Sequence, residues 1–196
     1  MAQHALLVLA HPRGDSLTAW IAQGARARLV ADGYTVDLLD LYAEGFDPRT
    51  GTADEPDWTN RDKEYSPEVR LHTGRIEAAD LIVVVFPVWW FGLPAILKGW
   101  IDRVWNYGFA YGRSRPRLEG KRMLWLGLSS YSREQFAGAG WDVLIDRQLR
   151  VGISEFCGIK NASVEFVHDS LSADPRRLAE ADAALASFTA REGITT

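Results

Sequence analysis

Apolar runs alternate with amphipathic segments about five times along this chain of 196 residues. Such alternation is typical of parallel strands joined by crossover helices, because a strand that is covered on both faces reads as one continuous apolar run. The predicted strands are ALLVLA (5–10), YTVDLLDL (34–41), LIVVVF (81–86), RMLWLGL (122–128) and ASVEFV (162–167). Five strands in this succession suggest an α/β domain over residues 1–196 with a parallel sheet of order 2-1-3-4-5.

Helix signals follow these strands. The predicted helices run from Ser16 to Gly33, from Pro94 to about residue 105, over about 141–156 and over about 175–192. The first of them carries Leu17, Trp20, Ile21, Gly24, Ala25 and Arg28. A long polar loop follows the second strand, and Ser66 with Pro67 is expected to cap a further helix after it. A loop of this length inside a compact domain is more often functional than idle.

The composition, with 47% hydrophobic and 24% charged residues, is that of an ordinary globular domain. The stretch 81–97 contains no charged residue and approaches the length that spans a bilayer, about 20 residues. Pro87, Gly92 and Pro94 interrupt it, and its β-branched residues favour a strand. We therefore expect no membrane span.

Charge and cysteine usage exclude several further classes. Cys157 is the single cysteine and cannot form an internal disulfide, and the first residues lack the pattern of a signal peptide, so we expect a cytoplasmic protein. The net charge is -4 and the arginines are scattered, so nothing recommends nucleic acid as a partner. The four histidines, His4, His11, His72 and His168, are too scattered to suggest a local metal motif, and we expect no metal site.

The segment FPVWWFGLP (86–94) places three consecutive aromatic residues directly after a predicted strand. In the order 2-1-3-4-5, the loops at 11–18 and 87–94 lie on either side of the point where the strand order reverses, so we expect them to face one cleft. Aromatic faces beside backbone amides suit a flat conjugated ligand. Core packing is the alternative for any one of these aromatics.

The other wall of the predicted cleft is AHPRGDSLTAW (10–20), which lacks both the dinucleotide fingerprint and the Walker pattern. Ser16 and Thr18 offer hydroxyl groups at a helix N-terminus, and His11 or Arg13 adds positive charge. Unpaired amides at such a terminus attract a phosphate. The alternative is that Ser16 or Asp15 only caps the helix.

The chain resembles the flavodoxin-like NAD(P)H:quinone oxidoreductases of the DT-diaphorase type in four segments. These segments are AHPRGDSLT, FPVWWFGLPAILKGWIDRVW, GFAYG (108–112) and GISEFCG (152–158). This resemblance covers most of the chain and implies a flavodoxin-like three-layer sandwich that binds flavin. It implies that the first loop holds the flavin phosphate and that the aromatic loop and the turn after the fourth strand support the isoalloxazine. The corresponding residues are His11, Ser16, Leu17 and Thr18; Pro87, Val88, Trp89, Trp90 and Phe91; and Leu128, Ser129, Ser130 and Tyr131.

The resemblance also implies an acceptor pocket in which Tyr111 and Phe156 match aromatic residues that line it across a dimer interface. The aromatic-rich segment GWIDRVWNYGFAYG gives a second reason to expect a homodimer, because it offers more apolar surface than a small monomer leaves exposed. Members of the family use a tyrosine and a histidine near the flavin, and those positions correspond here to Arg133 and Ala139. Either Arg133 or Tyr131 could replace the missing pair, and a solvated surface role is an alternative for Arg133.

The resemblance therefore implies a flavin-dependent oxidoreductase that transfers hydride from NAD(P)H through bound flavin to a quinone or a similar flat acceptor, by a ping-pong mechanism. FMN is expected rather than FAD, because the chain lacks the additional carboxyl-terminal region of longer FAD-binding members. No side chain need act as a nucleophile, so we name no catalytic residue. The alternatives are an electron-carrier flavodoxin and a regulatory flavoprotein subunit of a potassium efflux transporter.

Overall fold

All five predicted strands are present in one parallel sheet of order β2-β1-β3-β4-β5, which confirms the predicted fold class. The structure is a computed structural model that describes residues 3–114, 116–172, 174 and 176–190. The strands are β1 (His4–Leu9), β2 (Thr35–Asp40), β3 (Leu81–Pro87), β4 (Arg122–Leu128) and β5 (Asn161–Val167). The strands β3 and β4 are buried throughout, which explains their nearly uninterrupted apolar sequences.

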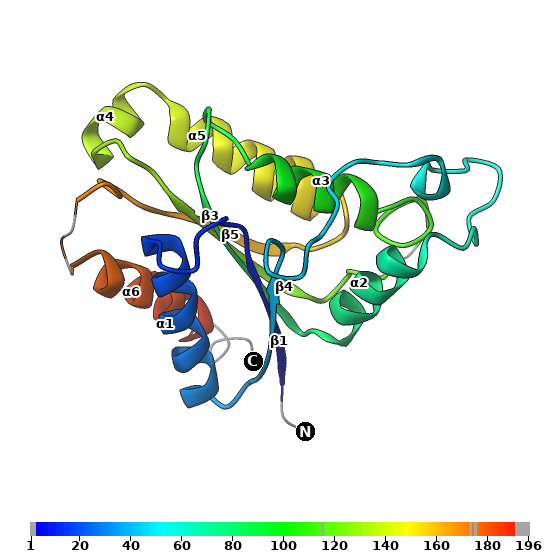
Figure 1. The fold of residues 1–196 in the computed structure, drawn as a ribbon, viewed down its shortest axis with the longest axis horizontal. Coiled ribbons are helices and arrows are strands. Elements are labelled where there is room, and N and C mark those ends of the chain that lie inside the picture. The colour runs from blue at the N-terminus through cyan, green and yellow to red at the C-terminus, as the bar shows by residue number, and fades with distance from the viewer. Residues whose placement is uncertain (1–2, 115, 173, 175, 191–196) are drawn as a thin grey trace.

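Helices cover both faces of this sheet (Figure 1). The helices α1 (Leu17–Ala31) and α6 (Arg176–Ala190) lie side by side on one face. The other face is covered by α2 (Pro67–Ala78), α3 (Ala95–Val104), α5 (Trp141–Asp146) and the π-helix η2 (Arg147–Glu155). Each face has its own hydrophobic core, so the fold is a three-layer sandwich.

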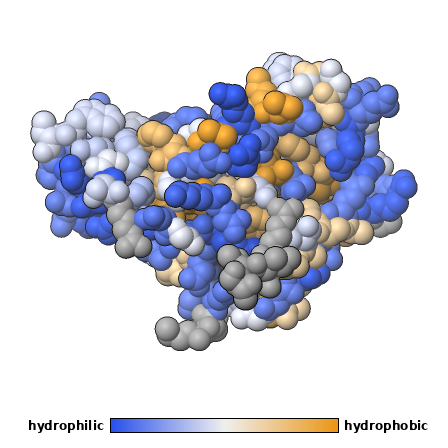
Figure 2. Space-filling model, turned by 180° about the vertical axis from the view of Figure 1, so that it is seen from behind, coloured by the Kyte–Doolittle hydropathy of each residue, from blue (hydrophilic) through white to orange (hydrophobic). Residues whose placement is uncertain are grey.

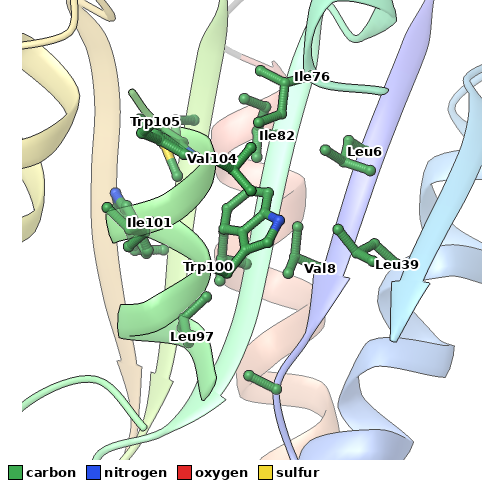
Figure 3. Packing of buried hydrophobic residues seen from close by; sticks show 14 of the residues in the cluster. Leu6, Val8, Leu39, Ile76, Ile82, Leu97, Trp100, Ile101, Val104 and Trp105 are labelled. Atoms are coloured by element: carbon green, nitrogen blue, oxygen red, sulfur yellow. The ribbon is translucent and has the colours of Figure 1, made fainter. Parts of the chain in front are cut away.

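Trp100 is the central side chain of the core beneath α3. Its side chain is fully buried and shares one cluster with Val8, Leu39 and Ile82 of three neighbouring strands (Figure 3). Such a bulky buried side chain fixes the position of α3 on the sheet, because a large volume change in a close-packed core is costly. The position of α3 in turn fixes the aromatic loop that precedes it.

The helix predicted over 141–156 is present but is irregular, since α5 continues into the nine-residue π-helix η2. Apolar spacing does not distinguish these two kinds of helix, so the sequence did not reveal the change. A short helix, α4 (Arg133–Gly138), was not predicted. Ser132 and Gln135 form a capping box at its start, and this Ser-x-x-Gln spacing is a signal that could have revealed it.

One expectation about exposed aromatic residues needs correction. Trp100, Trp105 and Phe109, in the segment that was expected to leave a large apolar surface, are all buried in the monomer. That part of the argument for a homodimer is therefore wrong, because the fold of one chain already covers these rings.

The long loop between β2 and α2 is held against α3. It includes a 3-10 turn, η1 (Thr52–Asp54), and it passes so close to Gly99 that a β-carbon there would come within 2.3 Å of the carbonyl oxygen of Pro48. The predicted cap after this loop is confirmed, because the Ser66 hydroxyl accepts from the Val69 amide at 3.3 Å and Pro67 is the first residue of α2. None of the helices in the described ranges is long and apolar enough to cross a bilayer.

Candidate functional site

The aromatic loop after β3 is a tight turn with an unfavourable backbone. Trp90 and Phe91 have φ angles of 51° and 57°, in the left-handed region that seldom suits bulky residues. The backbones of Trp89 and Gly92 exchange two hydrogen bonds around them, at 3.1 and 3.3 Å. Two-residue turns of this kind usually contain asparagine or glycine. Such conformational strain is commonly found at functional sites.

The three aromatic side chains of this turn lie in different surroundings. Phe91 is half-buried and stacks on Trp141 of α5, with the ring centroids 3.9 Å apart and the planes at 16°. Trp89 is 41% exposed, whereas Trp90 is 97% exposed. Core packing therefore explains part of the burial of Phe91 but does not account for either tryptophan.

The first loop lies against the aromatic loop, as the strand order predicted. The His11 ring is 5.9 Å from the Trp89 ring, centroid to centroid. The Nδ1 atom of His11 accepts a hydrogen bond from the Arg13 amide at 3.1 Å, and partial burial lowers the pKa of this imidazole. Arg13 also forms an exposed ion pair with Asp15 at 3.0 Å.

The helix α1 begins directly after this loop. The Ser16 hydroxyl accepts from the Ala19 amide at 3.2 Å, so Ser16 is the N-cap that the simpler interpretation expected. Its own O–H group is a donor that this bond does not use. The side chains of Ser16 and Thr18 are both buried, and the first-turn amides have no partners inside an α-helix.

The turn after β4 lies beside the aromatic loop. Tyr131 lies with its ring 5.9 Å from the Phe91 ring, and its amide donates to the Ser129 hydroxyl at 3.2 Å. The amide of Val88 donates to the carbonyl of Leu128 at 2.8 Å and joins the two loops. Ring contacts therefore link the aromatic loop to both of its neighbours at the carboxyl edge of the sheet, where ligands of such folds collect.

Arg133 and Ala139 lie on α4 and in the turn that follows it, and both are exposed. Arg133 lines a cavity on the β5 side of α4 together with His168. The ring of Tyr131, in contrast, lies near the rings of Phe91 and Phe136. Of the two candidates to replace the missing pair, Tyr131 is thus the one in ring contact with the aromatic loop.

Tyr111 and Phe156 are brought together within one chain, with their ring centroids 5.5 Å apart. They line a cavity of about 380 Å³ with Trp58 of the long loop, whose ring is 6.2 Å from that of Tyr111. Trp105 also lines this cavity, and its buried Nε1 atom has no hydrogen-bond partner among the described residues. Sequence reasoning missed Trp58, Trp105 and Trp141, because only the tertiary fold brings them to these positions.

Metal ligation receives no support where the structure describes the chain. Within those residues, no group of three or more histidine, cysteine, aspartate or glutamate side chains could hold a metal ion. The buried Cys157 is also a poor nucleophile, because burial raises the pKa of its thiol to about 12. The three neighbouring loops therefore offer rings, hydroxyl groups and amides for binding.

Known proteins share both this sequence and this fold. A family described as having a flavodoxin-like fold matches residues 3–189. The uncharacterized NAD(P)H oxidoreductase YcaK of Escherichia coli (strain K12) is 42% identical over 172 residues, which cover 88% of this chain and 87% of that protein. NAD(P)H dehydrogenase [quinone] 1 of Rattus norvegicus is 32% identical over 188 residues, with 85% and 69% of the two chains covered.

A solved structure gives the same result for the fold. The NAD(P)H:quinone oxidoreductase from Methanothermobacter marburgensis superposes with a TM-score of 0.88 at 24% identity, and all of both chains is covered. The fold and the sequence relatives lead to one conclusion. The chain belongs to the flavodoxin-like family that includes the NAD(P)H:quinone oxidoreductases.

Proposed function

We propose that this protein is a flavin-dependent NAD(P)H:quinone oxidoreductase. The bound flavin would accept hydride from NADH or NADPH and pass two electrons to a quinone or a similar flat acceptor. The observation that carries this proposal is the pair of ring contacts, His11 with Trp89 and Phe91 with Tyr131, which join three loops at the carboxyl edge of the sheet. The sequence relatives that are NAD(P)H oxidoreductases support the same reaction.

The first loop fits a flavin phosphate. The first-turn amides of Leu17 and Thr18 point out of the α1 terminus, where the helix dipole favours an anion. The free O–H group of Ser16 and the Thr18 hydroxyl would add donors, and His11 would close the site from the other side. In this role, Ser16 caps the helix with one lone pair and binds phosphate with its proton.

The aromatic loop and the turn after β4 fit a flat ring system. Pro87, Val88 and the three aromatics of the turn would lie along the isoalloxazine, and the backbone of 128–131 would face its polar edge. Trp141 would act as a positioning residue, because it fixes the Phe91 ring from behind. Tyr131 would donate a hydrogen bond to the reduced flavin, in place of the missing tyrosine and histidine pair.

The acceptor would bind beside the flavin against Tyr111 and Phe156, in the cavity that Trp58 also lines. We propose that a second copy of the chain completes this site. Trp58 is 66% and Phe156 64% exposed, which leaves large rings uncovered in the monomer. Figure 2 shows one face of the molecule, on which hydrophobic residues lie among hydrophilic ones. Sedimentation that shows only an active monomer at micromolar concentration would exclude the dimer.

The decisive experiment is to release the cofactor from purified protein and determine its mass. We expect a yellow protein with about one flavin per chain, FMN rather than FAD, and a cytoplasmic location on cell fractionation. A colourless protein that binds neither added FMN nor added FAD would exclude the proposal. Turnover of NAD(P)H with a quinone distinguishes this enzyme from an electron carrier, whereas co-purification with a membrane transporter would support the regulatory alternative.

A further inference from the structure

The π-helix η2 buries a serine and leaves a phenylalanine exposed. Leu149 and Ser154 are both fully buried, whereas Phe156, directly after the helix, is 64% exposed. A buried serine beside an exposed phenylalanine reverses the usual preference of these residue types. π-Helices are rare and are frequently found at functional sites. The exchange of the two side chains follows from the register of η2.

The helical register decides which side chains the sheet covers. In an α-helix, residues at i, i+4 and i+7 share one face, so Leu149, Ile153 and Phe156 would all face the sheet. Positions five apart lie roughly 140° apart around an α-helix, so Ser154 would point away from Leu149. In η2 the hydrogen bonds span five residues, and the Phe156 amide accordingly donates to the carbonyl of Val151 at 3.2 Å. This wider turn buries Ser154 together with Leu149.

The two apolar residues that the wider turn removes from the sheet line the proposed acceptor cavity. Ile153 and Phe156 both contribute to this cavity of about 380 Å³, and Ile153 is half-buried. The Phe156 ring lies 5.5 Å from the Tyr111 ring, centroid to centroid. The π-helical register therefore supplies one wall of the cavity.

Hydrogen bonds of the Ser154 hydroxyl hold this register. The hydroxyl donates to the carbonyl of Leu149 at 2.8 Å, five residues back, whereas a serine in an α-helix reaches the carbonyl three or four residues back. The sulfur of Met123 lies 3.6 Å from the same oxygen and is a weaker acceptor than the carbonyl. Ser154 also accepts from Nε1 of Trp125, a fully buried side chain of β4, at 3.0 Å. In an α-helical register Ser154 would point away from the sheet and leave this indole donor unpaired in the core, which is unfavourable.

We propose that Ser154 is a positioning residue of the acceptor pocket, because it holds η2 in the register that turns Ile153 and Phe156 toward the cavity. This inference rests on the proposed function, which assigns the cavity to a quinone or a similar flat acceptor. Ser154 is fully buried and does not itself line the cavity. Its loss should therefore weaken acceptor binding and leave flavin binding unchanged.

The first test measures quinone reduction by flavin-loaded Ser154→Ala. We expect the KM for quinone to rise about tenfold, the effect of one lost hydrogen bond on the pocket wall, with kcat and the flavin dissociation constant unchanged. Thr189→Val is the matched control and should retain the wild-type KM. The Thr189 hydroxyl also donates to a carbonyl of its own helix, that of Ala186 at 3.2 Å, but lies in α6 on the opposite face of the sheet. An unchanged KM in Ser154→Ala, or a loss confined to kcat or to flavin affinity, would overturn the proposal.

A double variant keeps the test decisive if Ser154→Ala does not fold. Ser154→Ala combined with Trp125→Phe removes the acceptor and the donor together, so this pair leaves no polar atom unpaired in the core. The double variant should show the same raised KM for quinone. A wild-type KM in the folded double variant would exclude a positioning role for Ser154.

Amide hydrogen exchange tests the register without quinone turnover. The amides of Phe156 and Ile159 both donate to carbonyls five residues back, at 3.2 and 2.9 Å. In Ser154→Ala their exchange should accelerate about tenfold, while the amides of α1 exchange as in the wild-type protein. Equal acceleration in α1 and η2 would show that Ser154 only stabilises the fold. A wild-type protein that reduces no quinone would refute the proposed function, whereas exchange would still decide whether Ser154 holds the register.

Discussion

The guanidinium of Arg103 in α3 and the carboxylate of Asp54 in the long loop form a buried ion pair, with 2.6 Å between Nη2 and Oδ2. The two residues are 6% and 2% exposed. Arg103 also donates to Glu68 at 2.7 Å and to the carbonyl of Asp47, and Asn106 donates to the carbonyl of Asp54 at 2.7 Å. These bonds hold the loop that carries Trp58 against α3.

Removal of this arginine should be costly. Arg103→Met leaves the Asp54 carboxylate buried without its partner, and we expect a loss of about 3–5 kcal/mol in the free energy of unfolding. Arg49→Met is the matched control, because Arg49 pairs with Asp47 at 2.8 Å on the surface, where water screens the charges, and its removal should change the stability little. Urea denaturation of the two variants measures both values. Equal losses would show that the buried pair has no special role.

His72 makes stability depend on pH. Its Nδ1 atom accepts a hydrogen bond from Trp100 Nε1 at 3.3 Å, and burial, followed by the charge of Arg75, lowers the pKa of His72 below 6.5. The unfolded chain therefore takes up a proton first as the pH falls. The stabilisation is complete above pH 6.5 and is lost as the pH falls through the folded pKa.

We expect the free energy of unfolding to fall between pH 7 and pH 5, and the slope to be smaller in His72→Gln. The slope will not vanish, because burial also lowers the pKa of His11 and His168. An NMR titration of the His72 ring gives its pKa directly. A value above 6.5 would contradict this explanation.

The two N-cap serines give a clean test of the phosphate site. Ser16 and Ser66 both accept from an amide three residues ahead, at 3.2 and 3.3 Å, and aspartate caps a helix as well as serine does. Ser16→Asp should weaken flavin binding by about tenfold or more, because the carboxylate repels the phosphate. Ser66→Asp should retain wild-type affinity. If fluorescence titration gives the same constant for both variants, Ser16 does not contact the phosphate.

The stack of Phe91 on Trp141 should contribute to flavin binding. Trp141→Ala removes the ring that fixes Phe91, and we expect a loss of about 1 kcal/mol, or roughly fivefold in flavin affinity, as is typical of aromatic pairs. Trp20→Ala removes a tryptophan that is 57% exposed on α1 and serves as the control. Equilibrium dialysis with free flavin measures the difference. Equal affinities would remove Trp141 from a positioning role.

The proposal of a single flavin site predicts the sequence in which the two substrates bind. Nicotinamide and quinone must both approach the same reactive atom of the flavin, so they should bind in alternation. Double-reciprocal plots at several quinone concentrations should be parallel, and NAD(P)H should bleach the flavin under anaerobic conditions before quinone is added. Intersecting lines together with no bleaching would point to a carrier or to a ternary complex.

Most of the fold could be predicted from the sequence, because each strand is a run of apolar residues with few competing interpretations. β4 was predicted with the bounds that the structure shows, and Ser16 and Ser66 were recognised as helix starts. The strand order then placed the loops of His11 and Trp89 side by side, with 5.9 Å between the two ring centroids. These predictions depend on local hydrophobic patterns and on the rule that ligands of parallel sheets bind where the strand order reverses.

The remaining features depend on packing between distant segments. The exposed aromatic surface was misjudged because apolar residues at helical spacing do not reveal how many faces of α3 are covered, and Trp100 and Trp105 are both buried. The partners of Phe91 and Tyr111 come from 50 and 53 residues away in the chain, namely Trp141 and Trp58. The hydrophobic periodicity of a short stretch of sequence does not reveal contacts between residues so far apart in the chain.

The carboxylate of Asp54 binds a second partner besides Arg103, because its Oδ1 atom also accepts a hydrogen bond from the Ser66 amide at 2.9 Å. Residues 55–65 are therefore a loop that is closed at its base, while the tight approach of Pro48 to Gly99 fixes the segment before it. Doubling the length of such a loop costs only about 0.6 kcal/mol in closure entropy. Insertions around Trp58 should thus leave the domain folded, so the cavity that Trp58 lines can change its shape without loss of the fold.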